Sequence, residues 1–454
     1  MPSPSQESED SAAAEPSSGS SRRPVPAVVP WAYDGLHPTE AVQTPRQARG
    51  MRMFWWDGFF GWGSEAIVVQ YLALYAVAFG ATASQIGVLS AMVALAGASA
   101  FLPGARLAER WGHRKLIVVL TGGLGARPAL LALAILPFFF EGRQVVFIIA
   151  GVAAIRYFMV GVGIPAWTSL TADLVPSAVR GRFLASRSVG SGVSALLAVP
   201  LVGGIIAWAG FPRGWEIAWL LAFLLGLGST FAYARIPEPR PAPAAAVKTG
   251  GAVRLLDDTN FLFFCGTALL WNVALYGASP FFNVYLVENL GGSALWVGFL
   301  VAIAGVLELV GLSYFGPIID RRGSKWVMII GGLGIPFLPW AWVFVQAPWQ
   351  IIPVNIAGGF LWAAYNLGAL NLLLAISPDQ KRPTYAAAYQ SSVYLSAFLG
   401  PLMGGLLAQV YGYRLLFGLS GVGRLLSTLV FIRFVQEIRP RPALQPAPAP
   451  AEPS

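Results

Sequence analysis

The sequence is poor in charged side chains, in cysteine and in histidine. Only 11% of its 454 residues are charged, whereas a soluble globular protein averages about 25%, which argues against a soluble enzyme. The single cysteine, Cys265, excludes an intrachain disulfide and a zinc site built from cysteines. Two histidines, His37 and His113, are too few for a histidine metal centre or a triad. We therefore expect no enzymatic activity, no metal and no cofactor.

Long hydrophobic runs take the place of the missing charge. Hydrophobic residues make up 56% of the chain, and the mean hydropathy is +0.63. Apolar stretches recur at about twenty residues, the length that an α-helix needs to cross about 30 Å of hydrocarbon. We predict an all-α integral membrane protein with twelve spanning helices at 53–79, 84–105, 114–136, 144–170, 181–208, 215–234, 260–288, 293–318, 325–346, 349–375, 384–410 and 413–434.

The segments outside these spans divide the chain. Residues 1–50 are rich in Ser, Pro, Ala and acids, and residues 437–454 are rich in Pro and Ala, so both are predicted to be disordered tails. The longest internal connection, 235–259, contains PEPRPAPAAA and is predicted to link a six-helix bundle at 51–234 to a second at 260–436.

The basic residues lie mostly on one side of the predicted spans. The side that holds both termini carries 24 of the 30 Lys and Arg residues, and the other side carries only Arg143, Arg213 and Arg414. Because cytoplasmic loops are enriched in Lys and Arg, we predict a multi-pass protein of the plasma membrane with both termini in the cytoplasm. The net charge of +9 then follows from topology, so we expect no nucleic-acid partner.

The two predicted halves repeat each other. ARLAERWGHRK at 105–115 matches GPIIDRRGSKW at 316–326, which pairs Glu109 with Asp320. GGLG recurs at 122–125 and 331–334, and Pro-x-x-Gly-Gly recurs at 200–204 and 401–405. A repeat of six helices crosses the membrane an even number of times, so both copies point the same way.

The duplicated loop resembles the Gly-x-Leu-Ala-Asp-Arg-x-Gly-Arg-Lys hallmark of the major facilitator superfamily. The first copy has Ala105 in place of the initial glycine, and the second keeps Gly316. The resemblance covers about residues 51–436. It implies two six-helix halves, alternating access, and a loop that serves as a conformational latch with the residues Glu109, Arg110, Gly112, Arg114, Gly316, Asp320, Arg321 and Gly323.

The chemistry of the latch follows from its residue types. The acid can face a helix N-terminus or an arginine of the other half when the side with the termini is closed. Gly112 and Gly323 permit a tight reversal, and small residues at 104, 105 and 316 permit close helix packing. The alternative is that these charges only fix the topology.

A second motif lies in the fifth and eleventh spans. The copy at 400–405, Gly-Pro-x-x-Gly-Gly, resembles part of a signature of drug/proton antiporters, whereas the first copy has Val199 where the glycine is expected. We favour a structural interpretation, because paired glycines commonly serve close helix packing.

Charged side chains at membrane depth cost about 2.5–3.5 kcal/mol each on insertion scales, so each needs a function or a partner. We predict Glu65, Asp57 and Glu308 as candidates for proton coupling. Polar stripes lie on the first and seventh spans, with further polar residues on the fourth and tenth, and the family resemblance implies that these four helices line a central cavity. The cavity candidates are Arg156, Asn272, Tyr276, Ser279, Asn283, Trp271, Tyr365, Asn366 and Asn371.

Three arginines lie within spans. Arg156 either binds a carboxylate of the solute or neutralises Glu65. For Arg127 and Arg424 we favour a structural role, either snorkelling or pairing with a buried acid.

The function predicted from these features is secondary active transport of a small organic solute, coupled to protons. Nothing resembles an ATP-binding loop. The expected partners are the solute, protons and the lipid bilayer, with no protein partner required. The alternative is a membrane sensor or scaffold with the same fold. Within transport, a drug exporter and an importer of a sugar-like or anionic nutrient both remain open.

Overall fold

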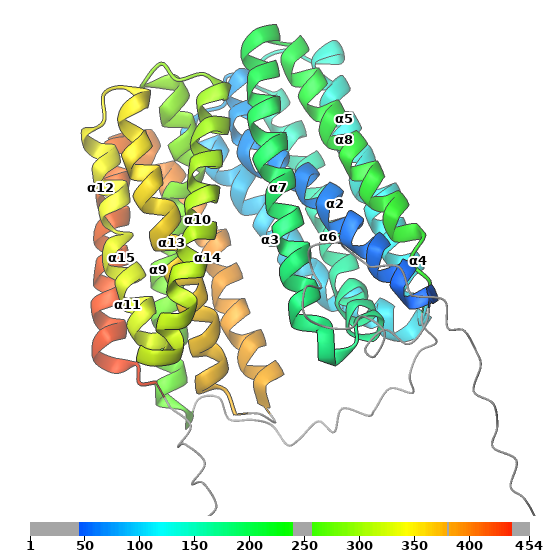
Figure 1. Cartoon of the computed structure of the whole chain (residues 1–454). Helices are drawn as coiled ribbons and strands as arrows, with labels where there is room; N and C mark the ends of the chain where they lie inside the picture. The colour runs from blue at the N-terminus through cyan, green and yellow to red at the C-terminus, as the bar shows by residue number, and fades with distance from the viewer. Residues whose placement is uncertain (1–44, 239–256, 379–380, 438–454) are drawn as a thin grey trace, which may run out of the picture.

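The computed structural model describes residues 45–238, 257–378 and 381–437 (Figure 1). All regular secondary structure in this described part is helical, which confirms the predicted fold class. The predicted C-terminal tail, except Glu437, and most of the tail at 1–50 and of the linker at 235–259 lie outside the described residues.

The first group of helices, here called the N-half, contains six spans. In chain order they are α2 (Pro45–Ala78), α3 (Ala83–Trp111), a broken span of α4 (Arg114–Val119), η1 (Leu120–Ala126) and α5 (Arg127–Phe139), then α6 (Val145–Leu174), α7 (Ser177–Ala209) and α8 (Arg213–Ala234).

The second group, the C-half, repeats this order. It contains α9 (Thr259–Glu288), α10 (Ala294–Arg322), a broken span of α11 (Ser324–Gly334) and α12 (Phe337–Phe344), then η3 (Pro348–Gln350) with α13 (Ile351–Ile376), α14 (Arg382–Tyr411) and α15 (Tyr413–Phe434).

By length and composition, 11 helical segments of the described chain can cross a membrane. The first predicted span, α2, is not among them, and its sequence includes Asp57, Glu65 and Gln70. Helix α2 begins at Pro45, whereas the sequence predicted a start at residue 53. Its first turns pack against the end of α6, where Gln47 Nε2 donates to Leu174 O at 3.2 Å.

The two halves meet at one end of the molecule. In Figure 1 they converge at the upper end and diverge at the lower end, where the described chain begins and ends. We call the lower end the termini side and the upper end the far side. Helix α3 packs against α14 and helix α10 against α7, so each crossing joins one helix of each half.

The repeated glycine motifs form these two crossings. A Cβ atom at Gly87 would overlap the carbonyl oxygen of Pro401 and approach Gly405. In the other crossing a Cβ atom at Gly298 would overlap the backbone of Pro200. Gly87 of the N-half therefore contacts the Pro-x-x-Gly-Gly motif of the C-half, and Gly298 of the C-half contacts that of the N-half. In both crossings the helix backbones are in direct contact.

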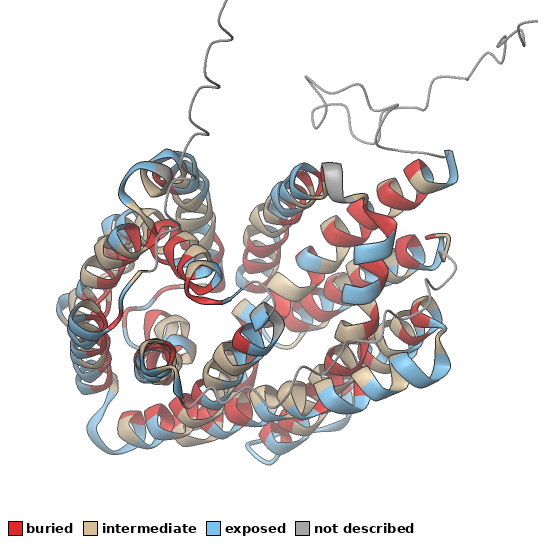
Figure 2. Cartoon of the chain, turned by 90° about the horizontal axis from the view of Figure 1, so that it is seen from below, coloured by how far each residue is buried: buried red, intermediate tan, exposed pale blue. Residues whose placement is uncertain are grey.

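The buried core is continuous across the far side. Its largest cluster includes Tyr71, Tyr75 and Trp219 of the N-half and Phe281 and Phe417 of the C-half. Seen from below in Figure 2, buried residues lie between helices and many exposed residues lie on the outer surface. Large apolar side chains such as Trp208 and Phe344 are exposed there, as expected for a surface that contacts lipid.

Candidate functional site: a central cavity beside a buried ion pair

A cavity of about 580 Å³ lies between the two halves, and we call it the central cavity. Its wall comes from α2, α3 and α6 of the N-half and from α9 and α14 of the C-half. Most lining residues are Val, Leu, Ala, Ile, Gly or Pro, and none of those in the described chain is charged. The cavity can therefore hold an apolar solute without stripping water from a charged wall.

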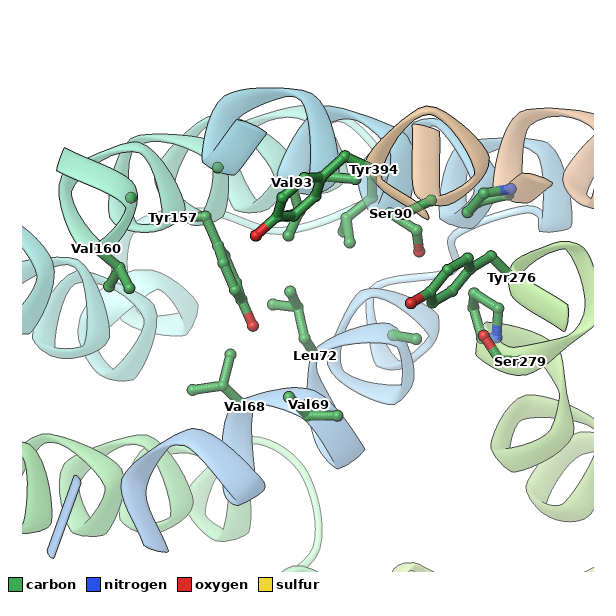
Figure 3. A pocket seen from close by; sticks show the side chains of 18 of the residues that line it. Val68, Val69, Leu72, Ser90, Val93, Tyr157, Val160, Tyr276, Ser279 and Tyr394 are labelled. Atoms are coloured by element: carbon green, nitrogen blue, oxygen red, sulfur yellow. The ribbon is translucent and has the colours of Figure 1, made fainter. Parts of the chain in front are cut away.

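Three tyrosines supply most of the aromatic surface. Figure 3 shows Tyr157 of α6, Tyr276 of α9 and Tyr394 of α14 converging on the cavity from three helices. Phe101 lies against Tyr394, with ring centroids 5.3 Å apart. Each ring offers a flat apolar face, and each tyrosine adds one hydroxyl that can donate or accept a hydrogen bond.

The other polar wall groups include one bond between the halves. Asn283 Nδ2 on α9 donates to Gln70 Oε1 on α2 at 3.0 Å. Ser90 of α3 and Ser279 of α9 also line the cavity, and both lie near Tyr276 in Figure 3. This bond joins α2 of the N-half to α9 of the C-half.

An ion pair between Arg156 and Glu65 lies next to Tyr157 of α6. Arg156 Nη2 donates to Glu65 Oε2, and Tyr157 Oη donates to Glu65 Oε1 at 2.8 Å. The Arg156 side chain is 1% exposed and that of Glu65 is 23% exposed, so water can reach the carboxylate but hardly the guanidinium. Of the two roles predicted for Arg156, the structure displays the pairing with Glu65.

A second cluster of charges lies closer to the termini side. Arg187 Nη2 of α7 donates to Asp57 Oδ2 at 3.0 Å, and Ser229 Oγ of α8 donates to Asp57 Oδ1 at 2.8 Å. Ser229 in turn accepts a bond of 3.3 Å from Arg127 Nη2. Arg127 is also close enough to interact electrostatically with both Asp57 and Glu65.

The predicted cavity residues separate into two groups. Tyr276, Ser279 and Asn283 line the central cavity. Arg156 lies in the N-half at its ion pair with Glu65, and the rest lie on α9 and α13 in the C-half, away from the cavity. Trp271 and Tyr365 are buried there and stack on each other with centroids 4.0 Å apart. The remaining amides bond elsewhere: Asn272 to Ala268 O, Asn371 to Leu367 O, and Asn366 to Glu308 Oε1 at 3.5 Å.

The two arginines assigned a structural role each contact a side chain of their own half. Arg127 bonds to Ser229 in the charged cluster, so its contact with Asp57 is indirect. Arg424 is 2% exposed and lies 5.8 Å from the ring of Trp271, with no acid within ion-pair distance in the described chain. The burial of Arg424 argues against snorkelling for that residue.

The latch residues lie at the open termini side. Glu109 and Arg110 are exposed, as is Arg321, and no ion pair reaches Glu109 within the described residues. Arg114 Nη1 instead pairs with Asp173 Oδ2 at 2.6 Å inside the N-half. The side chain of Asp320 lies outside the described residues.

The glycines of the latch behave differently from one another. Gly112 and Gly323 adopt φ of 65° and 91°, which supports the predicted tight reversal. Gly104 packs against the backbone of Val162. Gly316 has no atom within 4 Å of its Cβ position, so the close approach predicted there is absent.

Gln70, Ser90 and Phe101 of the cavity wall escaped sequence analysis, and so did four further residues of the site. Tyr157 follows Arg156 directly, but its place in the cavity wall and its bond to Glu65 both depend on the fold. Tyr394 lies on α14, a helix that sequence analysis did not place at the cavity. Arg187 was counted with the basic residues of the termini side, and Ser229 is an ordinary serine of an apolar helix. A buried acid predicts that a partner exists, but not which of several arginines supplies it. No group of three His, Cys, Asp or Glu residues able to hold a metal ion occurs in the described chain.

Comparison with known proteins points to one family. The family model described as Major Facilitator Superfamily matches residues 54–358 and 260–453. A multi-drug resistance efflux pump PmrA homolog of Lactococcus lactis is 25% identical over 430 residues, covering 89% of this chain and 99% of that protein. Multidrug resistance protein MdtG of Salmonella arizonae is 25% identical, covering 81% of this chain and 91% of that protein.

Solved structures share the fold. A bacterial homologue of the iron transporter ferroportin, in an inward-facing state, superposes with a TM-score of 0.67 at 15% identity, covering 85% of this chain and 98% of that one. The D-xylose-proton symporter gives a TM-score of 0.65 at 17% identity, covering 85% and 97%.

Proposed function

Because the chain belongs to the Major Facilitator Superfamily and is a secondary transporter, we propose that it exports uncharged or singly cationic aromatic compounds in exchange for protons. The observation that carries this proposal is the central cavity, whose wall is apolar and aromatic and whose Tyr157 donates a hydrogen bond to the part-buried carboxylate of Glu65. The two relatives at 25% identity are named as multidrug proteins, which supports the same class of solute.

The chemistry of the wall favours this solute over the two nutrient classes. No Lys or Arg lines the cavity in the described chain, and Arg156 is held by Glu65, so an anion would enter without a countercharge. A sugar presents hydroxyls on all sides, whereas polar groups are a minority of this wall. An aromatic ring can stack on the tyrosines, and a single positive charge is attracted by their faces and by Glu65.

We further propose that the termini side faces the cytoplasm across the plasma membrane and that the structure represents the state open to it. The basic residues of that side support the orientation. In this state Glu65 is ionised and held by Arg156 and Tyr157. A proton on Glu65 removes the charge that both donors bind, so protonation and the shape of the cavity wall at Tyr157 are linked.

Transport assays with the purified protein in proteoliposomes test this function. Ethidium serves as an aromatic monocation, glucose as a sugar and benzoate as an aromatic anion. We expect a pH gradient to drive ethidium against its own gradient and to leave glucose and benzoate at background. Gradient-driven flux of benzoate or glucose in place of ethidium would overturn the solute class, and ethidium flux that ignores the pH gradient would overturn proton coupling.

A further inference from the structure

A second cavity, of about 410 Å³, lies inside the N-half. We call it the inner chamber. Its wall comes from α2, α4, η1, α5, α6, α7 and α8, and none of its described lining residues belongs to the C-half. It meets the central cavity at Val160 and Ile164, which line both.

The deep charges of the N-half gather at the inner chamber. Asp57, Glu65, Arg127 and Arg187 line it, whereas the described wall of the central cavity carries no charge. Arg156 adjoins the chamber through its ion pair with Glu65. Charged and uncharged walls are thus sorted into two adjacent cavities, and Glu65 is bonded to Tyr157 at their boundary.

Part of the chamber wall offers polar partners to water, because Asp57, Arg127 and Ser229 line it. Arg127 lines the chamber, and its buried Nε has no acceptor among the described residues. Buried donors of this kind are normally satisfied by ordered water, and the chamber has room for many molecules. The groups facing the two acids are Arg187 of α7, Ser229 and Tyr233 of α8, Arg127 of α5, and Arg156 and Tyr157 of α6.

A local irregularity of the backbone builds one wall. Segment η1 is a π-helix in which the backbone N–H of Arg127 donates to Gly122 O, one residue further back than in an α-helix. Pro128 follows and has no N–H to donate. π-Helical segments are rare in proteins, and those that occur are often found at functional sites. Here the segment lines the chamber with Thr121 and Gly122 and leads directly into Arg127.

We propose that the inner chamber is the route by which the proton of Glu65 leaves toward the termini side, separate from the route of the solute. This inference rests on the proposed proton coupling at Glu65. As the solute enters the central cavity, Glu65 gives its proton to chamber water and becomes a carboxylate bonded to Arg156 and Tyr157. The proton passes along chamber water and Asp57 to bulk water, and Asp57 returns to its ion pair with Arg187.

Separate routes for the proton and the solute allow the two to move in the same step. A large solute fills the central cavity and would exclude water from it, so a proton confined to that route would have to leave before the solute binds. With its own hydrated exit, Glu65 can lose its proton while the solute is bound. The positive charges of Arg127 and Arg187 favour the deprotonated forms of Glu65 and Asp57 at the end of the step.

A plug in the chamber tests the proposal. In a Cys265→Ser background, which has no other thiol, Gly122→Cys places a thiol in the chamber where a Cβ meets no atom within 4 Å. Modification with benzyl methanethiosulfonate then fills the chamber, and dithiothreitol empties it again. Gly151→Cys is the matched control, because its Cβ position is equally open but lines neither cavity.

Each protein is compared with its own modified form. We expect modified Gly122→Cys to lose pH-driven ethidium transport, to keep ethidium counterflow, which moves no net proton, and to recover after reduction. Bound ethidium should slow the labelling of Ser90→Cys in the central cavity, but not that of Gly122→Cys. Modified Gly151→Cys should keep both fluxes.

Three results would overturn the proposal. They are an unreactive Gly122→Cys, full modification without loss of pH-driven transport, and equal loss of both fluxes, which would place the solute in the chamber. Failure of the proposed function itself looks different, because the unmodified Cys265→Ser protein would then show no pH-driven transport at all.

Discussion

Tyr157 donates its hydroxyl to Glu65 at 2.8 Å while its ring forms part of the wall of the central cavity. Its neighbour Arg156 bonds to the other oxygen of the same carboxylate. Two consecutive residues of α6 therefore hold Glu65, but only one of them touches the space for the solute. The ion pair stays out of the solute cavity, and Tyr157 is the side chain through which each can affect the other.

Replacing Glu65 by Gln should abolish proton coupling. The variant cannot exchange a proton at this position, so pH-driven transport should be lost, while counterflow of the solute down its own gradient survives. It also leaves the buried Arg156 without its countercharge, which costs about 3–5 kcal/mol in comparable cases. Both fluxes should therefore be measured in proteoliposomes on protein shown to be folded.

A double variant separates coupling from stability. Glu65→Gln with Arg156→Gln removes both charges, so we expect its thermal stability to recover relative to Glu65→Gln, while pH-driven transport stays absent. Normal pH-driven transport by Glu65→Gln would remove Glu65 from the mechanism and leave Asp57 or Glu308 as the proton site.

Replacing Tyr157 by Phe should uncouple the solute from the proton with little loss of binding. The ring and its apolar contacts remain, but the bond to the carboxylate is lost, and hydrogen bonds to charged groups contribute about 1.5–3 kcal/mol. We expect ethidium affinity close to that of the wild type and fewer protons moved per ethidium. Tyr394→Phe is the control, because Tyr394 lines the same cavity without contacting Glu65. Equal effects of the two substitutions would argue against a special role for Tyr157.

The fold was predictable because membrane spans are encoded locally. Twenty apolar residues predict a span wherever they occur, and the duplicated motifs fix the relation of the two halves. The start of α2 was missed, since Pro45–Arg52 is helical through its packing against α6 rather than through its own hydropathy.

The candidate site was predictable only in part, because it depends on which helix faces meet. Glu65 was identifiable as a costly buried charge, and the stripe of Tyr276, Ser279 and Asn283 does line the cavity. Trp271 lies on the same helix, at a rotation that turns it into the C-half core. The pairing of Asp57 with Arg187 joins residues 130 positions apart, which no local pattern indicates.

The latch remains a prediction from the sequence, and its mutation should favour the state seen here. If Glu109 and Asp320 close the termini side, Glu109→Gln and Asp320→Asn remove contacts made only in the closed state. We expect a thiol at Ser90→Cys, in a Cys265→Ser background, to react faster with a membrane-impermeant reagent added on the termini side. Thermal stability should change little in this state, since Glu109 is exposed and makes no ion pair within the described residues. Unchanged reactivity in both variants would reduce the motif to a signal for topology.

Substitutions at the glycines of the two helix crossings should favour opening of the far side, the end opposite the latch. Gly87→Ala places a methyl group against the carbonyl oxygen of Pro401, and Gly298→Ala places one against the backbone of Pro200. Neither backbone can move aside as a flexible side chain would. Overpacking of this kind costs about 1–3 kcal/mol, which would change the ratio of the two states by roughly fivefold to a hundredfold. We expect faster labelling of Ser90→Cys from the far side, and no change for the control Gly266→Ala, whose added methyl meets no atom within 4 Å.

Combining the two kinds of variant tests whether both gates belong to one equilibrium. Glu109→Gln removes contacts of the state open to the far side, and Gly87→Ala adds a clash to the state open to the termini side. The two residues lie at opposite ends of α3, so their effects on the free-energy difference should add with opposite sign. The double variant should then label Ser90→Cys from each side at rates between those of the single variants. Faster labelling from both sides at once would instead mean that the gates open independently, and alternating access would not describe this protein.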